Sequence, residues 1–162
     1  MTPPKLRPSE VHVVPAAAQG EPLPVPAAIA VMVRADRVLL VQRRNPPDVG
    51  MWGFPGGKRE PGESALGNAR RELAEETGLR AWALCAFDRV AVEARDGAGA
   101  ITHRFTLDAV LCRHAGGELR AGDDAAAAEW VPVADVLAGA RALHRDVDRV
   151  LARALALGAG RF

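Results

Sequence analysis

Cysteine is scarce in this sequence, where only Cys85 and Cys112 occur and neither belongs to a CxxC pair. A zinc ribbon needs four cysteine or histidine ligands in close spacing, so two isolated cysteines exclude it. Nothing in the sequence implies an oxidising compartment, and we therefore expect two reduced thiols in the core rather than a disulfide.

Long apolar runs and an excess of charge of one sign are also missing. No run approaches the ~20 residues that span a bilayer, and the first residues lack the charged-then-apolar order of a signal peptide. With 21 basic and 20 acidic residues, no strong field attracts the chain to nucleic acid or to an anionic membrane. These absences predict a cytoplasmic protein whose partners are neither a nucleic-acid polymer nor a membrane.

Proline is unevenly distributed. Residues 1–26 contain seven of the twelve prolines, which oppose both a helix and a central strand. We assign residues 1–26 to a proline-rich arm and residues 27–162 to a single domain. The arm is either a loose tail or an element that packs on a neighbouring subunit of a homodimer, in which case residues 11–14 could form an edge strand.

Hydrophobic periodicity and turn residues predict the elements of the domain. Strands are expected at 27–33, 38–43, 51–54, 79–94, 101–112 and 129–133, with a tight glycine turn at 55–57 and a long loop at 114–128. Helices are expected at 64–77, between a serine start signal and a glycine stop, and at 136–157, where apolar residues form a stripe. Interleaved strands and helices predict an α/β fold with a mixed sheet between helices.

The first predicted helix carries Glu72, Glu75 and Glu76 at positions i, i+3 and i+4. This spacing places three carboxylates on one helical face, where like charges repel. A divalent cation would remove the conflict, and hard oxygen ligands suit magnesium or manganese. A solvated acidic face is the alternative interpretation of the same spacing.

The same segment resembles the signature box of the Nudix hydrolases, G-x5-E-x7-R-E-U-x-E-E-x-G-U, where U is aliphatic. Every defined position is matched, by Gly57, Glu63, Arg71, Glu72, Leu73, Glu75, Glu76, Gly78 and Leu79. The flanking segments 38–44, 52–57 and 129–131 also look like the family, so the resemblance covers roughly residues 27–133.

The resemblance implies an α/β/α sandwich and a Mg2+ cofactor, with Mn2+ as an alternative. It implies metal binding by the three glutamates of the box and by the carbonyl of Gly56. Arg71 would hold a box glutamate in place, although a surface partner of Glu75 is the simpler interpretation. Glu63 either stabilises the start of the helix, where a carboxylate is favourable, or contacts the residues that bind the metal without binding the metal itself.

The remaining site residues also follow from the resemblance. A further metal-binding acid falls on Asp124, with Asp123 as the runner-up, and Glu72 or Asp124 would act as general base. Arg44, or else Arg43, would contact substrate phosphates, since only one of two successive strand residues points to a given face. Any of three aromatic residues could stack on a nucleobase, although a core position is the alternative for each, namely Trp52, Phe54 and Phe105.

The implied activity is Mg2+-dependent cleavage of the pyrophosphate bond in a small nucleotide, best an ADP-ribose-like nucleoside diphosphate derivative. Two family marks are missing: the proline of ADP-ribose-specific members is replaced by Arg95, and the absence of tyrosine removes the mark of diadenosine polyphosphate hydrolases. A MutT-like nucleoside triphosphate pyrophosphohydrolase is therefore the alternative. A non-catalytic nucleotide sensor is disfavoured, because sensors often lose box glutamates that are intact here.

Overall fold

The computed structural model describes residues 20–46, 48–122 and 124–161, and the predicted edge strand at 11–14 lies outside these residues. In chain order the elements are β1 (Pro24–Arg34), β2 (Arg37–Arg43), β3 (Trp52–Gly53), β4 (Gly56–Lys58), α1 (Ala65–Thr77), β5 (Leu79–Arg95), β6 (Ile101–Gly117), β7 (Ala125–Pro132), α2 (Val133–Leu137) and α3 (Val147–Ala156). Strand β1 thus includes the last three residues of the predicted arm.

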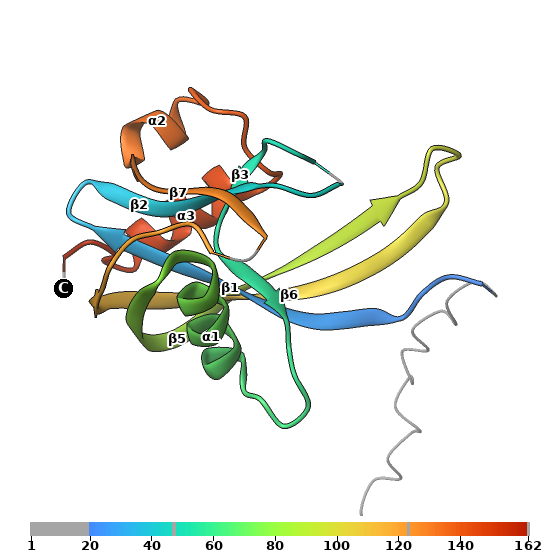
Figure 1. The fold of residues 1–162 in the computed structure, drawn as a ribbon, viewed down its shortest axis with the longest axis horizontal. Coiled ribbons are helices and arrows are strands. Elements are labelled where there is room, and N and C mark those ends of the chain that lie inside the picture. The colour runs from blue at the N-terminus through green and yellow to red at the C-terminus, as the bar shows by residue number, and fades with distance from the viewer. Residues whose placement is uncertain (1–19, 47, 123, 162) are drawn as a thin grey trace, which may run out of the picture.

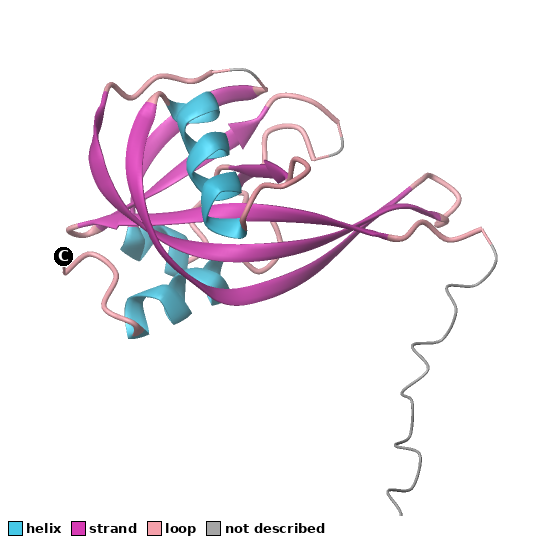
Figure 2. Cartoon of the chain, turned by 90° about the horizontal axis from the view of Figure 1, so that it is seen from below, coloured by secondary structure: helices cyan, strands magenta, loops and turns pink. Residues whose placement is uncertain are grey.

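The strands form one seven-stranded sheet of mixed direction. Its main path runs β3-β2-β1-β6-β5, while β4 pairs with β1 and β7 pairs with β2. The β1–β6 pairing is parallel and the others are antiparallel. Figures 1 and 2 show α1 on one side of the strands and the other two helices on the opposite side, which confirms the predicted α/β/α sandwich.

Strand β1 supplies both halves of the core because successive side chains of a strand point to opposite faces. Ala30 and Met32 pack in the cluster beneath α1, together with Leu73 of that helix. Val31 and Val33 pack in the second cluster, beneath α3. All four are buried, so β1 is the central strand on which the two layers are assembled.

Several predicted boundaries were wrong. Residues 125–128 extend β7, because they pair with β2 from Arg43 onward, and the long loop shrinks accordingly. The glycines at 56 and 57 belong to β4 rather than to a turn, since they pair with β1. The predicted helix at 136–157 is two helices, and Gly139, in the left-handed region at φ 68°, lies between them.

The hairpin of β5 and β6 is longer than expected. Each strand has 17 residues, and Figure 1 shows the hairpin projecting beyond the rest of the domain. Both cysteines lie on it as free thiols, Cys85 exposed and Cys112 buried. Cys112 is therefore a core thiol as predicted, whereas Cys85 is not. No described helix is long and apolar enough to cross a membrane.

Candidate active site

Helix α1 has strong local start and stop signals. The Ser64 Oγ accepts a hydrogen bond from the Gly67 N–H at 3.0 Å, which caps the first turn. Gly78 ends the helix in the left-handed conformation at φ 71°, and its N–H donates to the Ala74 carbonyl. The helix predicted at 64–77 is thereby confirmed, and with it the one-sided placement of its glutamates.

Strand β4 brings two glycines against this helix. The Gly56 N–H donates to Glu76 Oε2 at 3.1 Å. A Cβ atom on Gly57 would come within 2.5 Å of the carboxyl carbon of Glu72, so only glycine allows this close approach. Asn68, which is fully buried, donates from Nδ2 to the carbonyls of Gly57 and Lys58 at 3.2 and 3.3 Å. The backbone of β4 is therefore fastened to the acidic face of α1.

Arg71 organises the carboxylates around it. Its guanidinium donates to both oxygens of Glu63, at 2.8 and 3.1 Å, and to Glu72 at 2.9 Å. It also reaches Glu75 at 3.2 Å and the Lys58 carbonyl at 3.0 Å. The surface-partner interpretation is too narrow, because the side chain is only 24% exposed and connects three acids with β4. The hydrogen bond from Arg71 also lowers the pKa of Glu63.

Glu76 has no such cationic partner among the described residues. Burial raises its pKa to about 8, although the hydrogen bond from Gly56 acts in the opposite direction. The negative charges of Glu72, Asp124 and Glu75 raise it further. Burial also raises the pKa of Glu72, against the lowering effect of Arg71. The site thus concentrates carboxyl groups that would ionise more readily beside an added positive charge.

The donor set fits a hard divalent cation. The carboxylates of α1 and the backbone oxygen of Gly56 are oxygen ligands of the kind that magnesium and manganese prefer, and the raised pKa of Glu76 indicates that its position lacks positive charge. As the side chains lie here, no group of three or more acidic, histidine or cysteine residues within the described ranges is close enough to hold a metal ion. Arg71 draws Glu72 and Glu75 toward itself, whereas Glu76 bonds to Gly56.

Asp124 lies where the start of β7 meets the end of β2. Its carbonyl accepts from the Arg44 N–H at 3.2 Å, and its Oδ1 accepts from Asn45 Nδ2 at the same distance. Its charge also contributes to the raised pKa of Glu76, which places Asp124 within electrostatic reach of α1. Its runner-up, Asp123, lies outside the described residues.

The two predicted phosphate-binding arginines lie at the same corner. Arg44 Nη2 donates to the Ala125 carbonyl at 3.1 Å, whereas Arg43 Nε donates to the Asn45 carbonyl at 3.0 Å. Both arginines are tied to the start of β7, Arg43 by strand pairing with Ala125 and Arg44 by its side chain, so the preference for Arg44 stays a prediction.

The predicted base-stacking residues differ. Trp52 and Phe54 are 8% and 9% exposed and pack in the core cluster beneath α3, so the structure favours the core interpretation of both over substrate stacking. Phe105 is partly exposed on β6, stacked on His103 with a centroid distance of 6.0 Å and with Lys58 Nζ 6.0 Å from its ring centre. Phe105 is thus the better candidate for contact with a base.

Sequence reasoning did not single out Asn68 or Asn45, although both contact backbone or side chains of the site. Asn68 could have been noticed as an amide next to buried alanine and leucine positions on an amphipathic helix. A buried amide is rarely left without hydrogen-bond partners, so its presence there indicates a polar neighbour.

Comparison with known proteins agrees with the geometry. The family model described as NUDIX domain matches residues 23–154. A Mycobacterium tuberculosis protein named "Putative 8-oxo-dGTP diphosphatase 2" is 40% identical over 120 residues, covering 74% of this chain and 75% of the relative. A Methanocaldococcus jannaschii protein named ADP-ribose pyrophosphatase is 36% identical over 108 residues, covering 66% of this chain and 61% of the relative.

A solved structure shows the same fold. The NUDIX domain of Shewanella oneidensis NrtR, in complex with ADP ribose, superposes with a TM-score of 0.65 at 25% identity, covering 88% of this chain and 94% of that one. The complete box, the capped α1 helix and these similarities lead to the same assignment. The chain belongs to the NUDIX domain family and is a Nudix hydrolase.

Proposed function

We propose that this protein is a Mg2+-dependent pyrophosphohydrolase of a nucleoside diphosphate derivative such as ADP-ribose. The observation that carries the proposal is the acidic face of α1, where Arg71 bonds to Glu72 and Glu75 while the partly buried Glu76 bonds to β4. Divalent cations are general in the family. A bound cation neutralises phosphate charge and lowers the pKa of the attacking water.

Glu72, Glu75, Glu76 and the Gly56 carbonyl would hold the cation, with Asp124 as a further acid from the opposite corner. Arg71 would contribute to catalysis indirectly, because the hydrogen bonds from its guanidinium group fix the orientation of the glutamate carboxylates. Its Nη1 bonds to Oε1 of Glu72, which leaves Oε2 to accept a proton from water. Glu72 is accordingly our first choice of general base and Asp124 the second.

Arg44, with Arg43 beside it, would bind the phosphates, and Phe105 would contact the base. Arg44 lies next to Asp124 and Phe105 lies next to Lys58, so a nucleotide extended along β4 could reach both ends of this arrangement. Hydrolysis of ADP-ribose at the pyrophosphate would give AMP and ribose 5-phosphate.

A second candidate is an oxidised deoxynucleoside triphosphate, in a MutT-like reaction that removes pyrophosphate. It is favoured by the 40% identity to the M. tuberculosis relative, whose name states 8-oxo-dGTP as substrate. The two candidates share all the proposed metal-binding residues and differ in their products, which are a monophosphate with ribose 5-phosphate or a monophosphate with pyrophosphate.

The test is a product assay with Mg2+ across ADP-ribose, NADH, dinucleoside polyphosphates, 8-oxo-dGTP and the common nucleoside triphosphates. Glu76→Gln should lower kcat at least about a hundredfold, the scale lost when one key electrostatic contact is removed. Glu118→Gln, which changes an exposed glutamate outside α1, is the control. Near-normal turnover in Glu76→Gln would refute the metal-binding role of this side chain.

The homodimer also remains a proposal, with the proline-rich segment 1–26 as the exchanged element. Light scattering coupled to size-exclusion chromatography measures it directly. A chain lacking residues 1–19 should then elute as a monomer, and an unchanged dimer would refute the role of this segment.

A further inference from the structure

A hollow of about 520 Å3 lies between α1 and the hairpin of β5 and β6, apart from the acidic site. It is bordered by Arg71 and lined from α1 by Gly67, Arg70 and Ala74, at positions i, i+3 and i+7. At 100° per residue these positions share one face, and the glutamates of the box lie on the other side of the helix. The hollow is therefore a separate surface of the same helix.

The space in the hollow is left unfilled because several of the side chains around it are small. Gly67 and Ala74 of α1, Ala81 of β5 and Ala115 of β6 leave room that larger residues would fill. The volume falls in the range of about 300–1,000 Å3 that is usual for small-molecule sites.

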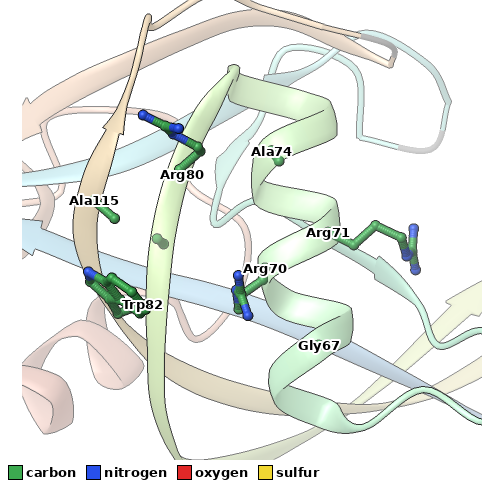
Figure 3. A pocket seen from close by; sticks show the side chains of 8 residues that line it. Gly67, Arg70, Arg71, Ala74, Arg80, Trp82 and Ala115 are labelled. Atoms are coloured by element: carbon green, nitrogen blue, oxygen red, sulfur yellow. The ribbon is translucent and has the colours of Figure 1, made fainter.

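The charge of the lining is wholly positive. Arg70 and Arg80 line the hollow, no acidic residue does, and neither guanidinium has a hydrogen-bond or ion-pair partner within the described ranges. Figure 3 shows Arg70 between α1 and β5, while Arg71 points away from the hollow toward the acidic side. Since Arg71 is neutralised by three glutamates, Arg70 and Arg80 are the charges that remain available to an anion.

The position of Arg80 depends on a glycine. A Cβ atom on Gly116 of β6 would come within 2.8 Å of Arg80 Nη2, and Gly116 has a φ of 129°. The Arg80 guanidinium therefore lies close to the backbone of β6, and a side chain at residue 116 would have to displace it. Arg80 itself is exposed, so its charge lies at the solvent-facing rim of the hollow.

Trp82 completes the lining. Its side chain is 56% exposed, whereas Trp52 is 8% exposed and Trp130 is partly buried. Exposing the apolar indole ring to water is unfavourable, and the flat face of the ring is a surface on which a nucleobase can stack. An aromatic face beside two guanidinium groups is suited to a planar base that carries phosphate.

We propose that this hollow is a second nucleotide site, which binds a nucleoside monophosphate or diphosphate with its base on Trp82 and its phosphate between Arg70 and Arg80. The protein supplies the positive charge, so binding here needs no divalent cation. That property separates this site from the acidic site, and the proposal does not depend on which nucleotide is hydrolysed there.

The experiment is a titration of the full chain with AMP in EDTA, followed by calorimetry and by tryptophan fluorescence. We expect saturable binding, with the affinity lowered at least tenfold in Arg70→Ala, Arg80→Ala and Trp82→Ala. Arg153→Ala removes an exposed arginine of α3 and is the matched control, which should bind AMP as the wild type does. Circular dichroism and thermal melting verify that each variant is folded.

Adenosine and inorganic phosphate test the two halves of the ligand, and each should bind more weakly than AMP. Metal-dependent hydrolysis should stay within twofold of wild type in the three variants, because the hollow lies away from the glutamates. The proposal is overturned by absence of saturable AMP binding, by unchanged affinity in the variants, or by equal affinity for adenosine and AMP. Loss of hydrolysis in parallel with binding would place the hollow in the catalytic site and also overturn it.

Discussion

Replacing Glu76 by glutamine in the metal-free protein should flatten the dependence of its stability on pH. The residue is partly buried, and the folded-state pKa of its carboxyl group is raised from 4.5 to about 8, chiefly by burial. Glutamine keeps a carbonyl oxygen that can accept from the Gly56 N–H, but it does not titrate. The comparison therefore isolates the cost of ionising a buried carboxyl group.

The sign follows from proton linkage. Because the folded-state pKa lies above the unfolded value, the native state binds more protons in the window between them, and stability falls as pH rises. The stabilisation is complete below pH 4.5 and is lost progressively up to pH 8. Each pH unit in this window costs about 1.36 kcal/mol, so the contribution of Glu76 changes by about 5 kcal/mol over the whole range.

The assay is urea unfolding in EDTA at several pH values between 5 and 8, with tryptophan fluorescence as the signal. The free energy of unfolding should fall more steeply with pH in the wild type than in Glu76→Gln, by about 1.36 kcal/mol per pH unit. Glu118→Gln, which alters an exposed carboxyl group outside α1, should keep the wild-type slope. Parallel slopes for wild type and Glu76→Gln would refute the buried, protonated state of this carboxyl group.

Three further predictions follow from individual contacts. Arg71→Ala should lower the free energy of unfolding, measured by urea titration, by at least about 2 kcal/mol, because it leaves partly buried carboxylates without their cation. A wild-type value would contradict this. Arg71→Lys should recover only part of the lost free energy, since an ammonium group cannot form the bidentate hydrogen bonds of a guanidinium. Gly57→Ala should lower kcat about a hundredfold with the fold retained, because its Cβ would displace the Glu72 carboxyl group, and unchanged kinetics would show that this displacement is tolerated. A thiol-reactive dye should label Cys85 in the native protein and Cys112 only after unfolding, because Cys112 is 1% exposed and burial raises its pKa to about 12; rapid labelling of both thiols would contradict this placement.

The position of helix α1 and of its glutamates could be predicted from the sequence, because both depend on local interactions. The start of α1 at Ser64 and its end at Gly78 depend on hydrogen bonds between residues three or four positions apart. The same short spacing places Glu72, Glu75 and Glu76 on one side of the helix. The acidic face of α1 could therefore be predicted without knowledge of the rest of the chain.

Elements that depend on distant partners were less predictable. Residues 125–128 are alanines with weak strand preference, and they are strand residues because β2 pairs with them. Two successive glycines by themselves favour a turn. In β4 they adopt a strand conformation instead, because they pair with β1 and the Asn68 side chain donates a hydrogen bond to the Gly57 carbonyl. In both cases a neighbour far away in the sequence outweighed local preference.

The same difference separates two of the aromatic candidates. Phe54 and Phe105 are equivalent as isolated residues, and only packing buries the first in the core and leaves the second beside Lys58. The hollow lined by Arg70, Arg80 and Trp82 is likewise invisible in the sequence, because it forms where α1 crosses the hairpin.

The sequence by itself determined the helix, its acidic face and the family, because each rests on spacing within a single continuous segment. The tertiary structure decided how β4 closes on that face, which acids Arg71 holds, and how deeply Glu76 is buried. These features are set by the pairing of strands far apart in the chain, and the burial of a carboxyl group is a property of everything packed around it.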